Sequence, residues 1–226
     1  MHFLMALLLA ASAEPPRVRA AREASSASIH ALFEKAGVAY PPGRVLLRGF
    51  KVNKQLELWA GPADAPLKLI RTYAICESSG RPGPKLRAGD GQVPEGFYEI
   101  SQLNPASNFL LSLRVSYPNA ADRKRSNARD LGGDIFIHGN CVTIGCIPIQ
   151  DGPIQELYVI AQDARVAGAR LDVHLFPGRD WEGMLAHPGA LGPFWENLRE
   201  GYDFFEREHV PPRVSIDVKG RYRFAR

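Results

Sequence analysis

Residues 135–151 read IFIHGNCVTIGCIPIQD, and this stretch decides how the middle of the chain folds. The apolar residues at its start predict a short buried strand that ends at His138. Its last residues lead into a helix over 154–167, for which Asp151 is a natural N-cap. His138 and Cys146 therefore stand on either side of a short loop.

Further strand-like segments lie on both sides of this stretch. They are rich in β-branched and aromatic residues, or alternate between apolar and polar, over residues 44–75, 95–100, 109–115 and 171–176. A loop rich in glycine and proline, residues 77–94, separates two of them, and a loop of that length within one domain is usually functional. The pattern predicts an α+β fold that is mainly β, with a few helices.

The N-terminal part of the chain differs from this middle. The apolar residues 1–13 end in Ala-Ser-Ala, which is typical of a cleaved signal peptide. Residues 14–43 are expected to form a small, polar and basic linker, followed by a short helix from Ser28 to Gly37.

The rest of the chain divides into a main domain and an extension. The main domain is expected over residues 44–176. Residues 177–226 predict a C-terminal extension made of one aromatic-rich helix over 193–208 and a β-hairpin. We expect this extension to pack on the main domain, because so short a segment cannot form a core of its own.

Charge and composition restrict the kinds of partner. The chain has 226 residues, a formal net charge of +4 and a pI near 9.0. Its Lys and Arg residues are scattered and form no stripe interleaved with aromatics, so nucleic acid is disfavoured, whereas an anionic polymer or peptide suits the mild basic charge. A signal peptide implies export to the periplasm or the cell wall, and we expect no membrane span after its cleavage.

Cys146 and His138 are a candidate nucleophile and base. Catalysis by a thiol needs a thiolate, a base that forms it, and backbone donors for the oxyanion. Gly145 allows a sharp turn just before Cys146, so that amide N–H groups can point at a substrate carbonyl. An imidazole next to the thiol lowers the thiol pKa, and the predicted strand brings His138 within reach of Cys146.

Three other interpretations of these residues remain open. The first is a buried His beside an inert Cys. The second is a metal site, because His138, Cys141 and Cys146 are spaced H-x2-C-x4-C and His174 could supply a fourth ligand. That spacing lacks a paired C-x2-C, so we expect no metal and no cofactor. The third is a disulfide, either Cys141–Cys146 or Cys76–Cys141, although a small buried thiol is the default role for Cys76.

Several motifs together resemble one family. The segment IHGNCVTIGC, with GPKLRAGDGQVPEGFYEI, LNPASNFLLSL and YPNAADR upstream, is similar to the YafK-type branch of the L,D-transpeptidase (YkuD) family. The resemblance covers residues 44–176, and the C-terminal PPRVSIDVKGRYRF fits that branch as well. It implies a mainly β catalytic domain, sandwich-like or barrel-like, and peptidoglycan stem peptides as substrates.

The resemblance also implies roles for the central residues. Cys146 would be the nucleophile and His138 the general base, with the Gly139 carbonyl orienting the imidazole. The N–H groups of Cys146 and Gly145 would hold the oxyanion. The widespread S-H-G-C motif of the family has a second His and a following Arg, which are absent from TIGCIP here, so their substrate-binding roles are not transferred.

The reaction that the resemblance implies is acyl transfer at an L,D bond through a thioacyl-enzyme. An amine acceptor would give a cross-link, whereas water would make the protein a hydrolase (amidase). One protein similar to this branch cuts an outer-membrane lipoprotein from peptidoglycan, so a peptidoglycan-linked lipoprotein is a further candidate partner. A non-catalytic wall-binding module would keep the fold with an inert Cys146.

Five further residues are candidates for contacts with the stem peptide. Lys85 and Arg87 lie in the long loop, where a positive charge could meet substrate carboxylates or simply be solvated. Tyr98, Tyr117 and Thr143 are also candidates, although aromatic residues of strands more often belong to the core.

Overall fold

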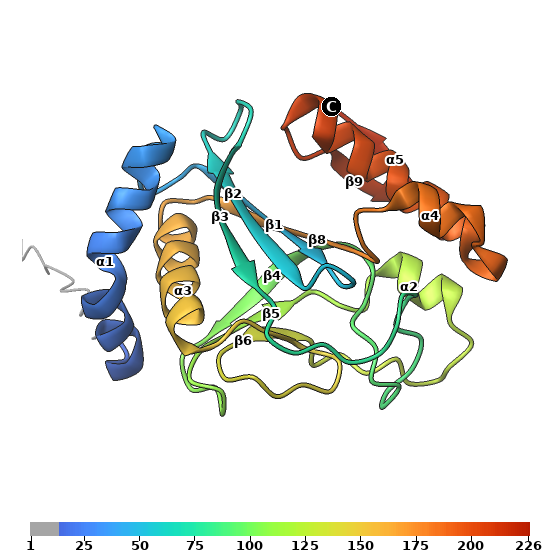
Figure 1. Cartoon of the computed structure of the whole chain (residues 1–226), viewed down its shortest axis with the longest axis horizontal. Helices are drawn as coiled ribbons and strands as arrows, with labels where there is room; N and C mark the ends of the chain where they lie inside the picture. Colours follow the sequence, from blue (N-terminus) through green and yellow to red (C-terminus); the bar gives the residue numbers. More distant parts are fainter. Residues whose placement is uncertain (1–13) are drawn as a thin grey trace, which may run out of the picture.

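The computed structural model describes residues 14–226, and its central feature is one sheet of eight strands (Figure 1). The expected signal peptide, residues 1–13, lies outside the described residues. The order across the sheet is β3-β2-β1-β8-β4-β5-β6-β7. The strands are β1 (Arg44–Phe50), β2 (Gln55–Gly61), β3 (Lys68–Ala74), β4 (Gly96–Asn104), β5 (Ser112–Val115), β6 (Phe136–His138), β7 (Ile147–Pro148) and β8 (Arg170–Phe176).

The sheet mixes parallel and antiparallel pairs and curls toward closure. β1 runs antiparallel to β2 but parallel to β8, and β6 runs parallel to β7. The two ends of the strand order meet, because the N–H of Cys76, just after β3, donates to the carbonyl of Pro148 in β7 at 3.1 Å. The predicted mainly β, barrel-like α+β fold is confirmed.

Two long helices, α1 (Pro16–Ala36) and α3 (Asp151–Val166), cover one face of the sheet (Figure 1). Alternate residues of each strand point to this face, so Leu47 of β1 and Val173 of β8 are buried in one core with Ile29 of α1. The two helices are joined by Arg22, which donates to both carboxylate oxygens of Asp163 at 2.8 Å.

The expected linker before Ser28 is wrong, because α1 already begins at Pro16. The helix starts with proline in its first turn and ends at Gly37, whose φ of +61° is the left-handed conformation that favours glycine. Its buried face includes the small residues Ala21 and Ser25. Small side chains give a weak apolar pattern, which explains why the sequence resembled a linker.

The C-terminal extension covers the other face of the sheet. It consists of α4 (Trp181–Ala186), a 3-10 turn (Gly189–Leu191), α5 (Gly192–Glu208) and the hairpin β9 (Arg213–Ile216) and β10 (Tyr222–Ala225). The helix and hairpin predicted in this region are therefore confirmed. Phe97 and Phe176 of the sheet are buried against Trp195 and Tyr222 of the extension. Each such aromatic contributes roughly 1.5–3 kcal/mol on burial, so this contact holds the extension in place.

Two details of the middle of the chain differ from expectation. The strand predicted over 109–115 begins only at Ser112, and Phe109 lies in the turn before it. The polar stretch that follows contains one short helix, α2 (Ala120–Arg125), which begins with a capping box between Asn119 and Asp122. Of all helices within residues 14–226, none has the length and apolar character needed to cross a membrane.

Candidate active site

The loop between β6 and β7 brings His138 and Cys146 together. His138 is the last residue of β6, and Cys146 directly precedes β7. Because β6 and β7 are parallel neighbours, the loop runs back from the end of β6 to the start of β7, which lies beside β6. Both side chains line one pocket of about 370 Å³, together with Phe109, Val142, Thr143 and Ile144, which we name the Cys146 pocket.

His138 is held in one orientation. Its ring is buried, and Nδ1 lies 2.6 Å from the Gly139 carbonyl, the contact that the family resemblance implies. A carbonyl can only accept, so Nδ1 carries the proton and Nε2 keeps the lone pair that a general base needs. Phe109 stacks on the ring with 4.5 Å between centroids. Burial lowers the pKa of His138 from its ordinary value of 6.5, and the Gly139 contact opposes this in part.

The Cys146 thiol is half-buried and directed at a carbonyl. Its Sγ lies 3.4 Å from the oxygen of Asp134, and no hydrogen bond to His138 is present among the described residues. Burial raises the pKa of the thiol above its ordinary value of 9.0, while a contact with the backbone of Phe136 and, to a smaller degree, the positive charge of Lys85 lower it in part. The two groups therefore form a neutral thiol and a neutral imidazole at pH 7.

The N–H groups expected to hold the oxyanion are already occupied. The N–H of Gly145 donates to Ser79 Oγ at 2.7 Å, and the N–H of Cys146 donates to Thr143 Oγ1 at 2.9 Å. The Thr143 hydroxyl in turn donates to the Cys146 carbonyl at 2.8 Å, so Thr143 closes its own loop. In this arrangement neither N–H group is free to hold an oxyanion, and both fix the turn before Cys146.

Two glycines are required by the backbone of this loop. Gly145 has a φ of +95°, and a Cβ there would lie 3.1 Å from the Gln92 carbonyl in the long loop. A Cβ on Gly139 would lie 2.6 Å from Asp151 Oδ1. Asp151 is the first residue of α3 and not its N-cap, and Oδ1 accepts the N–H of Asn140 at 2.7 Å. Its carboxylate therefore fixes the start of the loop between His138 and Cys146.

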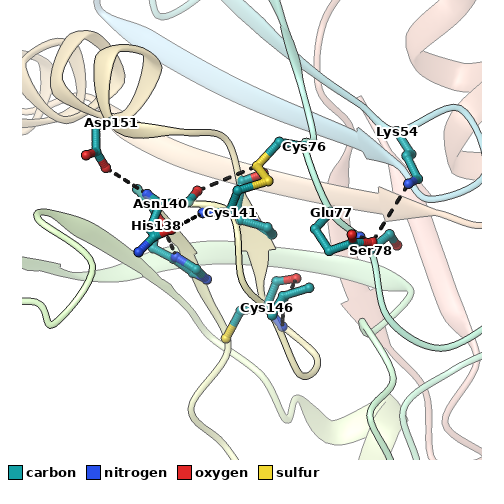
Figure 2. Close-up of a disulfide and its surroundings, with 12 residues drawn as sticks. Lys54, Cys76, Glu77, Ser78, His138, Asn140, Cys141, Cys146 and Asp151 are labelled. Atoms are coloured by element: carbon teal, nitrogen blue, oxygen red, sulfur yellow. Dashed lines mark hydrogen bonds and ion pairs between the residues drawn. A yellow bond between two sulfur atoms is a disulfide. The ribbon is translucent and has the colours of Figure 1, made fainter.

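One disulfide ties this loop to the opposite end of the sheet. Of the pairings left open by the sequence, Cys76–Cys141 is formed, with 5.8 Å between Cα atoms, and Cys146 is free. Cys141 turns away from Cys146 to reach Cys76 (Figure 2). The expectation of a small buried thiol at Cys76 is therefore wrong, and Cys141 is removed from the alternative metal site. No cluster of three or more potential metal ligands occurs within residues 14–226.

Replacing both disulfide cysteines with serine should lower the free energy of unfolding by about 2–4 kcal/mol. The bond closes a loop with a sequence separation of 65, so its loss frees much of the unfolded chain. Urea denaturation of the oxidised wild type and of the Cys76→Ser/Cys141→Ser variant measures the difference. Reductant should weaken the wild type and leave the double variant unchanged; equal weakening of both would contradict a role for this bond.

The other four candidate residues do not line the Cys146 pocket. The ammonium of Lys85 is buried, 2.7 Å from Asp90 and 2.9 Å from the Arg87 carbonyl, so it organises the long loop. The Tyr98 hydroxyl lies 3.1 Å from both oxygens of Asp122, and the Tyr117 hydroxyl lies 3.3 Å from the carbonyl oxygens of Lys85 and Leu131. Both tyrosines are buried core residues, while Arg87 is exposed.

Sequence reasoning missed several residues of the site. Phe109 was assigned to a strand, but Leu110 with its φ of +69° turns the chain and places Phe109 on His138. Ser79 has no distinguishing motif around it. Val142 and Ile144 are exposed apolar residues at the rim of the pocket, with 55% and 84% of their surface accessible. The signal available in the sequence was this pair of apolar residues in a loop that has neither helical nor strand periodicity.

Comparison with known proteins gives the family. No protein-family model matches the chain. It is 37% identical over 183 residues to the provisionally named L,D-transpeptidase YafK of Escherichia coli (strain K12), covering 79% of this chain and 72% of YafK. YafK of Escherichia coli O157:H7 matches to the same extent.

Two solved structures are similar to a lower degree. Pgp2, a helical cell shape determining protein of Campylobacter jejuni, has a TM-score of 0.48 and 16% identity, covering 84% of this chain and 80% of Pgp2. L,D-transpeptidase 1 of Mycobacterium tuberculosis has a TM-score of 0.34 and 10% identity, covering 59% of this chain and 62% of that enzyme. These similarities are too weak to add an argument. The 37% identity over most of both sequences shows that the chain belongs to the L,D-transpeptidase family, with YafK as a relative.

Proposed function

We propose that the protein is a cysteine acyltransferase of peptidoglycan stem peptides, with Cys146 as nucleophile and His138 as base. The observation that carries the proposal is a free cysteine that shares one pocket with a histidine whose Nε2 is left as an acceptor. Membership in the L,D-transpeptidase family supports the substrate class. The disulfide between Cys76 and Cys141 supports export to an oxidising compartment, the periplasm or cell wall.

The reaction begins from a neutral pair. The Cys146 thiol turns from the Asp134 carbonyl toward His138, and Nε2 takes the thiol proton as sulfur attacks the peptide carbonyl. The imidazolium that forms is stabilised by the Gly139 carbonyl, which accepts from Nδ1–H. The tetrahedral intermediate then collapses, the C–N bond breaks, and His138 returns the proton to the leaving amine. This leaves a thioacyl-enzyme and a neutral imidazole.

The second half-reaction decides between a transferase and a hydrolase. An amine acceptor gives up a proton to His138, attacks the thioester and forms a new amide, which is a cross-link. Water that attacks in the same way frees the stem peptide from Cys146 as a carboxylate, so the net result is hydrolysis of the bond whose amine component, a residue, peptide or lipoprotein, left in the first half-reaction. The thiol is restored in both cases, so the acceptor alone distinguishes the two activities.

Product analysis tests this proposal. Purified peptidoglycan, digested after incubation with the wild type or with Cys146→Ala, is compared by mass spectrometry. New cross-links identify a transferase, and released stem peptides or lipoprotein identify a hydrolase. A product profile that is the same for both proteins rejects the catalytic function. Sedimentation of that inactive protein with peptidoglycan would then favour the wall-binding module.

The pH dependence of kcat/KM should have its acidic limb below pH 6.5. His138 must be neutral to accept the thiol proton, and burial lowers its folded-state pKa from 6.5. As the pH rises through the pKa of His138, which lies under 6.5, the protonated and inactive ring becomes neutral. Activity therefore increases over this range. Initial rates on a defined stem peptide from pH 4 to 9, at constant ionic strength, measure the limb. An acidic limb clearly above pH 6.5 would mean that another group is the base.

A further inference from the structure

Ser79 joins the long loop to the turn that carries the nucleophile. Its hydroxyl accepts the N–H of Gly145 at 2.7 Å, and Gly145 directly precedes Cys146. On the other side of the same turn, the Gln92 carbonyl lies 3.1 Å from the position of a Cβ on Gly145. The turn is therefore seated between the two ends of the 77–94 loop.

A buried ion pair holds that loop in place. The ammonium of Lys51 donates to the carbonyls of Gly83 and Val93 at 2.8 and 2.9 Å, and to Glu95 at 3.0 Å. Because Gly83 and Val93 lie far apart within the loop, one side chain gathers its middle and its end. The three donors of the ammonium are thus all used.

Glu95 links the same loop to the C-terminal extension. Its carboxylate is fully buried and accepts three hydrogen bonds. Besides Lys51, the donors are the N–H of Gly83 at 2.7 Å and Nε1 of Trp195 in α5 at 3.0 Å. A charge this deeply buried is stable only with such partners, so the contact with Trp195 is part of the loop's support.

We propose that Ser79 is a positioning residue for Cys146, and that Lys51, Glu95 and Trp195 form the clamp that keeps Ser79 in place. Helix α5 then acts on the catalytic turn through the long loop. The inference rests on the proposed function only in taking Cys146 as the nucleophile. Without the Ser79 hydroxyl, the N–H of Gly145 has no acceptor, and the turn at Gly145, with its φ of +95°, is free to shift.

Ser79→Ala should change turnover and thiol reactivity in opposite directions. Turnover on stem peptide falls roughly ten- to hundredfold, because a nucleophile displaced by about 1 Å loses its alignment with His138 and the substrate. Alkylation by iodoacetamide becomes faster, on the order of three- to tenfold at pH 8, because a looser turn exposes the buried thiol and increases its thiolate fraction. Loss of folded protein would lower the Tm as well. The two opposite changes in rate at an unchanged Tm therefore distinguish a shifted turn from unfolding.

The alkylation experiment has a matched control for each step. In the oxidised protein Cys146 is the free cysteine, so intact-mass labelling over pH 6–10 follows one site. Ser78→Ala is the control for Ser79→Ala, since the Ser78 hydroxyl makes no hydrogen bond among residues 14–226. Ser79→Thr keeps the hydroxyl and should restore the wild-type profile. A Ser79→Ala profile that coincides with Ser78→Ala overturns the positioning role.

The clamp is tested by two tryptophans that differ in one hydrogen bond. Trp195→Phe removes the donor to Glu95 and should speed alkylation in the same direction as Ser79→Ala. Trp181→Phe is its control, because Nε1 of Trp181 is buried without a partner among the described residues. Equal profiles for the two Phe variants overturn the part played by α5. Alkylation needs no peptidoglycan, so a wild type without turnover would reject the proposed function and leave this test intact.

Discussion

Cys146→Ala should abolish turnover of stem peptides, lowering kcat by a factor on the order of 10⁴ or more. In the proposed reaction no thioacyl-enzyme forms without Sγ, and His138 is left with no nucleophile to deprotonate. The thiol makes one long contact, 3.4 Å to the Asp134 carbonyl, so its loss should leave the fold intact. Steady-state rates with a defined stem peptide measure the loss, and mass spectrometry shows whether a carbapenem still adds to the protein.

His138→Gln is the companion variant and should lower kcat by about 10²–10⁴, the usual contribution of a general base. It should also remove the acidic limb of the pH profile, which Cys146→Ala cannot test. His187→Gln serves as the control, since His187 lies at the end of α4, outside the Cys146 pocket. Turnover that survives Cys146→Ala would mean that another residue is the nucleophile.

The centre of the site was predictable because the local signals agree. An apolar run that ends at His138, a glycine before Cys146 and a helix soon after predict strand, turn and helix in one short stretch. The structure has β6, the turn at Gly145 and α3 in this order. Local sequence, however, could not predict that the Gly145 N–H binds a hydroxyl, because its partner Ser79 is 66 residues away.

The disulfide shows the same limit. Three cysteines allow two plausible pairings, and sequence spacing favours neither. The choice is made by the curl of the sheet, which brings the residue after β3 against β7 and so sets Cys76 beside the loop containing Cys141. Closure of a sheet depends on the pairing of strands far apart in the chain. That information is not present in any one segment of the sequence.

The start of helix α1 and the buried charges of Lys51 and Glu95 could not be predicted, for a different reason. The buried face of α1 includes Ala21 and Ser25, whose small side chains do not stand out from a polar segment. Lys51 and Glu95 are charged, so composition assigns them to the surface. Each is buried only because the other, together with backbone groups of the long loop, replaces water.

Glu95→Ala should lower the free energy of unfolding by about 3–5 kcal/mol, which is the usual cost of breaking a buried ion pair from one side. The variant leaves the Lys51 ammonium buried with no counter-charge, and it also leaves the N–H groups of Gly83 and Trp195 without an acceptor. Urea denaturation at pH 7, followed by tryptophan fluorescence, measures the loss. Thermal melting checks that the transition stays cooperative.

The exposed pair Lys54–Glu77 is the matched control for this prediction. Its charged atoms are 3.9 Å apart and both side chains are about half exposed, so Glu77→Ala should cost under roughly 1 kcal/mol.

The pH dependence of the stability deficit separates charge burial from lost packing. Burial already lowers the pKa of Lys51 from 10.5, and Glu95 opposes this shift, so the pKa falls further in Glu95→Ala. Between this lowered folded-state pKa and 10.5 the unfolded state binds more protons than the folded state, so stability rises with pH in that range. The deficit of Glu95→Ala should therefore shrink as pH increases from 7 toward 10, whereas a deficit independent of pH would attribute the loss to packing alone.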